Sequence, residues 1–264
     1  MANEINFGVI LAAGSAVRLQ PLSKYFPKLT LPVFDNPLIV HHFNIMKCVG
    51  VKKVFIVVSD YNFDVISTIL NKVDDINIEY EFVKQNVPNG TGHALWLLKD
   101  YLVSSRFLML LGDEYYNDIG SFSKLKEIDT NDNILGIVEY NDVKNIMTGC
   151  NVLYNGEHIQ QLIEKPKQAE IKDKWCWDGS VVLNSQIFEI LDEMCDEFEQ
   201  GIIDQICIVR AMQSMLDLNI SIKYFKKYCG NINITYDIDL IKASFIECSK
   251  KYDRDFLLSI LSGL

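Results

Sequence analysis

The sequence predicts an α/β fold built on a doubly wound, mostly parallel sheet. Apolar runs of strand length alternate with segments of helical periodicity through about the first 140 residues, and this alternation is typical of βαβ units. Hydrophobic residues make up 49% of the 264-residue chain, which is enough to bury a large core. Beyond about residue 140 the pattern is less regular, so we expect a second half with a different arrangement of elements.

The expected elements of the first half follow one another in a regular order. Short apolar runs predict strands over Phe7–Ala12, Lys53–Val58, Ile78–Val83, Phe107–Leu111 and Ile134–Glu139. Apolar residues at helical spacing predict helices between them, over Pro37–Val49, Phe63–Val73 and Gly92–Leu102.

The second half mixes strand-like and helical segments separated by polar turns. Strands are expected over Gly149–Tyr154, Ile159–Glu164, Gly179–Leu183 and Ile220–Phe225. Helices are expected over Gln186–Met194, Ile203–Leu218 and Asp237–Lys251, followed by a short amphipathic end, Phe256–Leu264. No Pro/Gly/Ser-rich linker or repeat divides the sequence. We therefore expect residues 1–264 to form a single domain, with one part over about 1–140 and another over about 141–264.

Charge and cysteine content restrict the class of partner. The net charge is −10, from 25 Lys and Arg against 35 Asp and Glu. Nucleic acid is therefore not expected as a partner, because its phosphates require a basic face. A small anion needs only a local cluster of positive groups. The seven cysteines form no C-x-x-C pair, which favours reduced thiols in a cytoplasmic protein.

The N-terminal residues predict neither export nor a membrane anchor. Met1–Gly14 contains no basic leader, and its apolar run is shorter than a membrane span requires. We therefore expect a cytoplasmic protein without a membrane partner, and the sequence is compatible with a homo-oligomer.

A small-residue loop follows the first expected strand. Gly14 and its neighbours leave room for a phosphate to approach the backbone, whose successive N–H groups bind anions. Arg18 would clamp the phosphate oxygens. The loop matches neither G-x-G-x-x-G nor the P-loop pattern, and an ordinary turn with a surface arginine is the alternative. The candidate nucleotide-binding residues of this loop are Leu11, Ala12, Ala13, Gly14 and Ser15.

A proline-rich segment, Pro21–Pro32, comes next and carries Lys28. Pro27 and Pro32 fix the backbone φ angle on both sides of this lysine. A lysine held beside a phosphate loop is a natural counter-charge for a triphosphate, whereas a solvated surface lysine is the alternative.

Together these two segments resemble the signature of the sugar-phosphate nucleotidylyltransferase family. The residues L-A-A-G-S-A-V-R-L, and then P-K-L-T-L-P, are similar to the family's L-A-[AG]-G-x-G-[ST]-R-L and P-K-x-L-[LV]-P. The resemblance implies a Rossmann-like nucleotidyltransferase fold, with Arg18 and Lys28 as the catalytic residues that stabilise charge on the NTP. Ala16 and Val17 depart from the family's Gly and Ser or Thr. Alanine costs about 1 kcal/mol if position 16 requires a positive φ.

Two further motifs resemble the family's nucleotide and metal sites. The stretch Gln85–Ala94 is similar to an element that reads a pyrimidine base, which implicates Gln85, Gly90 and Thr91. The structural alternatives to a binding role are that Thr91 caps the next helix and that His93 is a packed residue. Asp113 ends a buried strand and resembles the family's metal-binding aspartate, while the role of Glu114 is open.

A late element, Asn231–Leu240, is similar to the second metal-binding element of the family. Its alignment places Asn233 at the ligand position, and a shift of register would place Asp237 there instead. The resemblance thus implies a Mg²⁺ ion held by Asp113 and Asn233.

The acceptor half resembles the family's sugar-binding half. Gly149, and then Glu164 and Lys165 in an E-K-P sequence, match residues that contact the acceptor. Gly179 matches a glycine beneath the substrate. A solvated Glu–Lys pair is the alternative. On this resemblance about 1–140 binds the NTP, and about 141–264 binds the acceptor and supplies the C-terminal helices.

The sequence therefore predicts a Mg²⁺-dependent nucleotidyltransferase of the EC 2.7.7 type. Its partners would be an NTP, with a pyrimidine base favoured, and a phosphorylated acceptor such as a sugar 1-phosphate. A cytidylyltransferase acting on phosphocholine or a related amine stays open, and so does a non-catalytic nucleotide-sugar-binding regulator. A metal-dependent glycosyltransferase would show D-x-D, whereas Gly112-Asp113-Glu114 provides only one matching aspartate.

Overall fold

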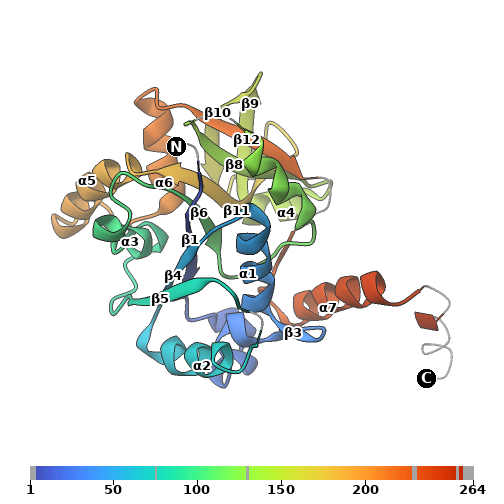
Figure 1. The fold of residues 1–264 in the computed structure, drawn as a ribbon. Coiled ribbons are helices and arrows are strands. Elements are labelled where there is room, and N and C mark those ends of the chain that lie inside the picture. Colours follow the sequence, from blue (N-terminus) through green and yellow to red (C-terminus); the bar gives the residue numbers. More distant parts are fainter. Residues whose placement is uncertain (1–3, 75, 129–130, 228–230, 254–255, 258–264) are drawn as a thin grey trace.

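The computed structural model describes residues 4–74, 76–128, 131–227, 231–253 and 256–257. Its largest feature is a nine-stranded sheet with the order β5-β4-β1-β6-β11-β8-β12-β10-β9 (Figure 1). The strands are β1 Phe7–Ala12, β4 Lys53–Val58, β5 Glu79–Lys84, β6 Arg106–Leu111, β8 Asn133–Glu139, β9 Cys150–Asn155, β10 His158–Glu164, β11 Trp175–Asn184 and β12 Ile222–Lys227. Short strands β2 Pro32–Val33, β3 Asn36–Pro37, β7 Glu114–Tyr115 and β13 Ile232–Asn233 lie outside it.

Parallel pairing is concentrated in the first half of the chain. Strands β1, β4, β5 and β6 are all parallel to their neighbours among these four. Strand β11 runs antiparallel to β6 and β8 and so joins the two halves. Strand β12 of the second half pairs in parallel with β8, and strands β9 and β10 are antiparallel to their neighbours. The doubly wound α/β fold is confirmed, and the antiparallel strands account for the less regular pattern beyond residue 140.

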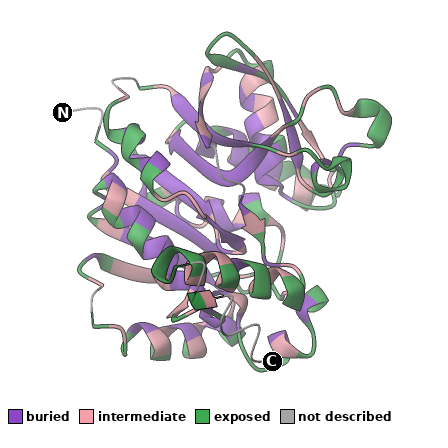
Figure 2. Ribbon diagram, turned by 90° about the vertical axis from the view of Figure 1, so that its right-hand side faces the viewer, coloured by how far each residue is buried: buried purple, intermediate pink, exposed green. Residues whose placement is uncertain are grey.

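Helices cover both faces of the sheet. They are α1 Leu38–Val49, α2 Asp60–Leu70, α3 Thr91–Trp96, α4 Val143–Thr148, α5 Ile187–Glu199, α6 Ile208–Asp217 and α7 Asp237–Lys251. One buried core lies between the sheet and α3, α5 and α6, and a second lies against α1 and α2 (Figure 1). The buried residues form the central layer in Figure 2. The sheet is continuous through both halves of the chain, so each half contributes to both cores.

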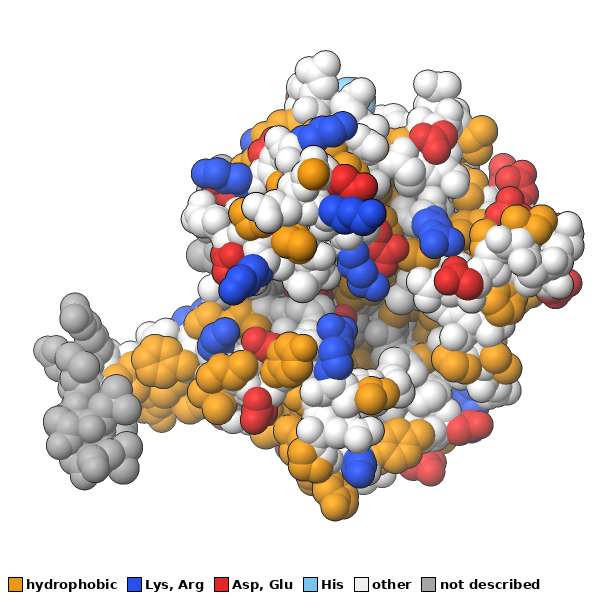
Figure 3. Space-filling view, turned by 180° about the vertical axis from the view of Figure 1, so that it is seen from behind, with side chains coloured by type: hydrophobic (Ala, Val, Ile, Leu, Met, Phe, Trp, Pro, Cys, Tyr) orange, Lys and Arg blue, Asp and Glu red, His pale blue; other side chains and the backbone are white. Residues whose placement is uncertain are grey.

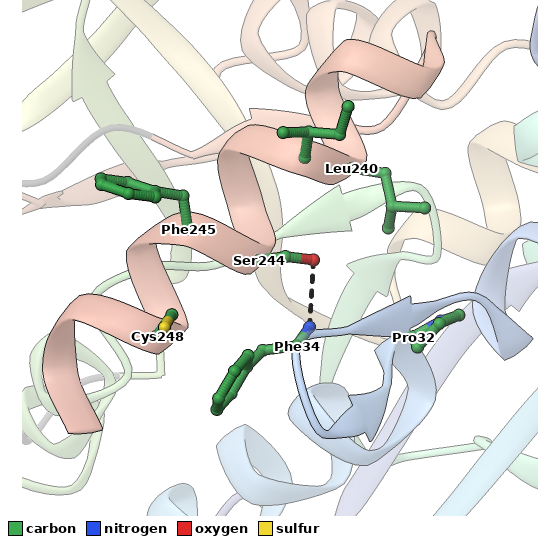
Figure 4. A pocket seen from close by; sticks show the side chains of 7 residues that line it. Pro32, Phe34, Leu240, Ser244, Phe245 and Cys248 are labelled. Atoms are coloured by element: carbon green, nitrogen blue, oxygen red, sulfur yellow. Dashed lines mark hydrogen bonds between the residues drawn. The ribbon is translucent and has the colours of Figure 1, made fainter. Parts of the chain in front are cut away.

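Helix α7 crosses to the N-terminal half and packs on the β2–β3 hairpin. The Phe34 amide donates a 3.0 Å hydrogen bond to Ser244 Oγ (Figure 4). A cavity of about 410 Å³ lies at this contact, lined by Pro32, Phe34, Leu240, Ile241, Ser244, Phe245 and Cys248. The contact fixes the start of α7 and therefore the strand β13 that precedes it.

Several helix boundaries differ from the expected ones, and α5 ends at Glu199 rather than Met194. Helix α2 begins at Asp60, because Ser59 accepts the Asn62 amide as an N-cap. Helix α3 ends at Trp96 and is followed by a 3₁₀ turn, Lys99–Tyr101. Helix α6 begins at Ile208 rather than Ile203. The amphipathic end expected over residues 256–264 lies mostly outside the described residues. Among the helices that the structure describes, none combines the length and the apolar character needed to span a bilayer.

Candidate functional site

The small-residue loop that contains Gly14 and Ser15, called the glycine loop from here on, lies at the carboxyl ends of β1 and β6. Leu11 pairs with Leu111 in the sheet, and the Gly112 amide donates a 3.0 Å hydrogen bond to the Leu11 carbonyl. Leu11 and Ala12 are buried, whereas Gly14 and Ser15 are exposed. The loop that follows β1 therefore lies next to Asp113, at the edge of the sheet where ligands bind in folds of this class.

Asn62 fixes this loop from behind, a role that the sequence did not reveal. Its buried side-chain amide donates to the carbonyl oxygens of Ala12, at 2.6 Å, and Gly14, at 3.3 Å. Bonds to the carbonyl oxygens suit a loop whose N–H groups are offered to an anion. Asn62 lies in the first turn of α2, fifty residues from Ala12, so no local pattern connects the two.

The residues after the loop adopt the conformation that the family pattern implies. Ala16 has φ 48° and ψ 40°, in the left-handed region. Position 16 therefore does require a positive φ, and alanine costs about 1 kcal/mol there relative to glycine. Arg18 lies in a short 3₁₀ helix, Val17–Leu19, and is exposed. It is therefore accessible to a ligand in the loop.

Lys28 and Asp113 lie side by side although eighty-five residues separate them. The Lys28 Nζ atom lies 3.4 Å from Asp113 Oδ2. The lysine side chain is 13% exposed and the aspartate side chain 38%. The lysine is thus held by its surroundings, while the carboxylate stays open to solvent beside the glycine loop.

Asp113 and the next residue, Glu114, form a small acidic cluster. Strand β7 pairs with β13, so that Glu114 is opposite Asn233. The Asn233 amide donates a 2.7 Å hydrogen bond to Glu114 Oε1, and Asn233 Oδ1 accepts from the Thr235 hydroxyl. Burial raises the pKa of Glu114 to about 8, the neighbouring Asp113 carboxylate adds to the shift, and the Asn233 hydrogen bond opposes it.

The position of Asn233 depends on the β7–β13 pairing. The Ile234 amide also donates to the Asp113 carbonyl at 2.8 Å, so the late element lies directly against Asp113. Asp237 is instead the exposed first residue of α7, and its Oδ1 accepts from the Ile238 amide. The register that places Asn233 beside the acidic cluster is therefore the one in the structure.

Asp113 fits a hard divalent cation, but Glu114 is buried and its carboxyl group accepts from Asn233. Mg²⁺ in proteins takes one or two carboxylates and completes its shell with water and substrate phosphates. Asp113 offers an exposed carboxylate, whereas Asn233 directs its NH₂ group at Glu114 and its oxygen at Thr235. Within the described residues no group of three or more His, Cys, Asp and Glu side chains is placed to hold a metal ion.

The segment expected to read the base is held by internal hydrogen bonds. Gln85 is buried, and its Nε2 contacts the Gly90 carbonyl at 3.1 Å and His93 Nδ1 at 3.0 Å. The His93 ring stacks on Trp96, which agrees with a packed role. The capping role considered for Thr91 is wrong, because Gly90 is the N-cap of α3 and Thr91 Oγ1 accepts from the Ile208 amide at 3.2 Å.

The residues expected to contact the acceptor form a second group. The Lys165 amide donates a 2.7 Å hydrogen bond to the Gly149 carbonyl, because β9 and β10 pair at their ends. Lys165 Nζ lies 3.8 Å from Glu164 Oε1 and is largely exposed. A cavity of about 500 Å³ beside Glu164 is lined by Gln161, Leu162, Ile163, Glu164, Val209, Arg210, Gln213 and Ser214.

Gly179 connects the acceptor half to the acidic cluster. It has φ +86°, and a Cβ atom there would lie 2.7 Å from Glu114 Cγ. Its neighbour Asp178 forms a 2.6 Å ion pair with Lys227, and both side chains are 0% exposed. No sequence pattern indicates this pair, because β11 and β12 are not adjacent in the sheet.

Figure 3 shows the face seen from behind, where a hollow separates the upper and lower parts of the molecule. Lys and Arg side chains lie on both sides of this hollow. Positive side chains around a hollow suit a small anionic ligand even though the whole chain is acidic.

The sequence also matches a family of known proteins. Residues 7–223 match the family model described as nucleotidyl transferase. The bifunctional protein GlmU of Methanococcus vannielii is 30% identical over 190 residues, which are 70% of this chain and 42% of that protein. The low-salt glycan biosynthesis nucleotidyltransferase Agl11 of Haloferax volcanii is 25% identical over 80% of this chain and 57% of its own length. The chain thus spans about half the length of these curated relatives.

Solved structures share the fold at lower identity. A UDP-glucose pyrophosphorylase complexed with UDP-glucose superposes with a TM-score of 0.80, at 20% identity over 93% of this chain and 99% of that one. The inositol-1-phosphate CTP transferase of T. maritima superposes with a TM-score of 0.78, at 19% identity over 94% of this chain and 97% of that one. Since the family model covers most of the sequence and the same fold recurs in these structures, the chain belongs to the nucleotidyl transferase family.

Proposed function

We propose that the protein transfers a nucleoside monophosphate from an NTP to a phosphorylated acceptor and releases pyrophosphate. A pyrimidine NTP and a sugar 1-phosphate are the favoured substrates. The observation that carries this proposal is the meeting of the glycine loop, Lys28 and Asp113 at the ends of β1 and β6. Family membership adds support, since the relatives include a glucose-1-phosphate thymidylyltransferase of Xanthomonas campestris.

The reaction is an in-line displacement at the α-phosphorus of the NTP. A phosphate oxygen of the acceptor forms the new P–O bond, and the bond to the bridging oxygen breaks with its electron pair leaving on pyrophosphate. A phosphate monoester is already anionic near neutral pH, so a general base is not required. Lys28, Arg18 and the N–H groups of Gly14 and Ser15 hold the phosphates and stabilise the charge that develops on them.

Asp113 would hold Mg²⁺ at the edge of the triphosphate, and Asn233, the second expected ligand, lies beside it through the β7–β13 pairing. When bound, the ion neutralises charge on phosphate oxygens. Lys28 lies 3.4 Å from Asp113, so it would also lie beside the triphosphate. Gln85 and Thr91 would frame the base, with Gln85 offering its Oε1 because its amide hydrogens are directed at Gly90 and His93.

The second half of the chain would bind the acceptor. Glu164 would accept hydrogen bonds from acceptor hydroxyls, and Lys165 would neutralise the acceptor phosphate. Gly149 and Gly179 would provide backbone contacts. On this assignment about 1–140 binds the nucleotide and about 141–264 the acceptor, while the continuous sheet keeps both groups in one body.

Pyrophosphate release tests the proposal. Purified protein with MgCl₂ would be mixed with UTP, CTP, dTTP, ATP or GTP, each paired with glucose 1-phosphate, N-acetylglucosamine 1-phosphate, inositol 1-phosphate or phosphocholine. We expect release with a pyrimidine NTP and a sugar 1-phosphate. Release with phosphocholine would select the cytidylyltransferase reading instead. NTP binding by calorimetry without release for any pair would favour a nucleotide-binding regulator.

Removing either positive side chain is expected to slow the reaction strongly. Arg18→Ala and Lys28→Ala should each lower kcat/KM by about two orders of magnitude, because both face phosphate oxygens whose charge grows in the transition state. Lys72→Ala, at an exposed position after α2, is the matched control and should keep wild-type rates. Near-normal kcat/KM in either test variant would reassign that residue to the solvated surface.

Asn233→Asp is expected to lower the Mg²⁺ concentration at half-maximal rate. Wild type presents only a neutral amide beside Glu114 and Asp113, and an added carboxylate would strengthen cation binding there. The control is Asp237→Asn, which removes a charge from the exposed start of α7. An upward shift in that control, with no change in Asn233→Asp, would identify Asp237 as the ligand.

A further inference from the structure

Residues 206–208 lie between the two groups of candidate site residues, where Ile206 and Cys207 lead into α6, which begins at Ile208. The Ile206 amide donates to the Asn89 carbonyl at 2.8 Å, and the Gly92 amide donates to the Ile206 carbonyl at 2.8 Å. The Ile208 amide then donates to Thr91 Oγ1 at 3.2 Å. Three hydrogen bonds therefore join this segment to residues 89–92, the turn that is expected to frame the base and is called the base-framing turn below.

The close approach between residues 206–208 and the base-framing turn depends on a glycine. Gly90 has φ +113°, and a Cβ atom there would overlap the Ile206 carbonyl oxygen. Both the backbone conformation and the lack of space exclude a side chain at this position. The base-framing turn and segment 206–208 thus form one packed unit rather than two neighbouring loops.

Cys207 joins the same segment to the acceptor group. Its thiol is 4% exposed, and its Sγ lies 3.1 Å from Glu164 Oε2. Burial raises the pKa of Cys207, and the Glu164 carboxylate raises it further. The thiol is therefore protonated and donates to Glu164. The other carboxylate oxygen of Glu164, Oε1, lies nearer the exposed Lys165.

We propose that Cys207 is a positioning residue that holds Glu164 in the orientation needed for the acceptor, with segment 206–208 anchoring it to the base-framing turn. The inference rests on the proposed function, in which Glu164 binds the acceptor. Glu164 has three side-chain torsions and a 31% exposed side chain, so it would sample several rotamers without a fixed partner. A hydrogen bond to one oxygen removes that freedom and leaves the other oxygen for the acceptor hydroxyls.

The test compares three variants by steady-state kinetics, using the substrate pair that gives release in the panel above. Cys207→Val has a similar volume and no donor, while Cys207→Ser keeps a donor. Cys195→Val, which removes a thiol from α5 on the same core, is the control. We expect Cys207→Val to raise the acceptor KM by about tenfold, the range for a hydrogen bond to a charged group. The NTP KM should stay unchanged, and Cys207→Ser should recover most of the loss.

A double-mutant cycle with Glu164→Gln separates positioning from packing. If Cys207 acts through the Glu164 carboxylate, Cys207→Val should add little to the acceptor KM of Glu164→Gln. Additive effects, an equal change in Cys195→Val, or a change confined to the NTP KM would each overturn the proposal.

The same cycle measured by urea unfolding needs no activity, so it separates failure of this inference from failure of the proposed function. Non-additive free energies of unfolding for Cys207→Val and Glu164→Gln support the Cys207–Glu164 bond even if no substrate pair releases pyrophosphate. Additive values refute the bond even in an active enzyme.

Discussion

Asp113→Asn is expected to lower kcat for pyrophosphate release by more than about a hundredfold. The substitution keeps the shape of the side chain and removes its charge. Asp113 is the exposed carboxylate at the end of β6, beside Lys28 and the glycine loop. Without it Lys28 would lose its counter-charge, and the Mg²⁺ held with the triphosphate would lose its accessible protein ligand.

The measurement is pyrophosphate release at saturating NTP and acceptor over a range of Mg²⁺ concentrations. Asp100→Asn, at an exposed position in the 3₁₀ turn Lys99–Tyr101 that precedes the amino end of β6, is the control for loss of a carboxylate. Circular dichroism would establish that both variants are folded. If Asp113→Asn kept more than about a tenth of kcat with an unchanged Mg²⁺ titration, Asp113 would not bind the metal ion.

Lys227→Met is expected to lower the free energy of unfolding by about 3–5 kcal/mol. Lys227 Nζ lies 2.6 Å from Asp178 Oδ2, and both side chains are 0% exposed. Removing the ammonium leaves the Asp178 carboxylate as an uncompensated charge in the interior. Urea unfolding followed by tryptophan fluorescence measures the loss.

The surface pair Lys99–Asp192 supplies a matched control. Its two charged atoms are also 2.6 Å apart, but the side chains are 44% and 39% exposed. Lys99→Met should therefore change the free energy of unfolding much less than Lys227→Met does. A similar loss in both variants would show that burial does not set the strength of the Lys227 pair.

The double variant Lys227→Met/Asp178→Asn tests the cause of the loss. It removes both charges and should recover much of the stability, since the isolated charge is the main penalty. No recovery would mean that the pair is needed for packing around Tyr116 and Phe122, whose rings lie within 4.4 Å and 3.8 Å of Lys227 Nζ. Because Asp178 precedes Gly179, the double variant also shows whether the pair shapes the contact with Glu114.

Short-range sequence patterns determined much of the secondary structure of this protein. The strands β1 and β4 and the helix α7 begin and end at the predicted residues, because side-chain periodicity is set by the backbone repeat of each element. Lys28 and Asp113 were also predicted as site residues, and the structure brings them together. The parallel strands β1 and β6 end at one edge of the sheet, which places Asp113 beside the loop after β1, whereas Lys28 reaches it from a short 3₁₀ helix, Lys28–Thr30.

Only the tertiary structure decided how the second half joins the first. Insertion of β11 between β6 and β8, the β7–β13 pairing that sets Asn233 beside Glu114, the Cys207–Glu164 bond and the Lys227–Asp178 pair all link residues far apart in sequence. Periodicity within one segment specifies which of its faces is buried, but it does not specify the partner that covers that face. That choice depends on packing and hydrogen bonding summed over the whole chain, and here it fixes the orientation of Glu164, Asn233 and Gly179.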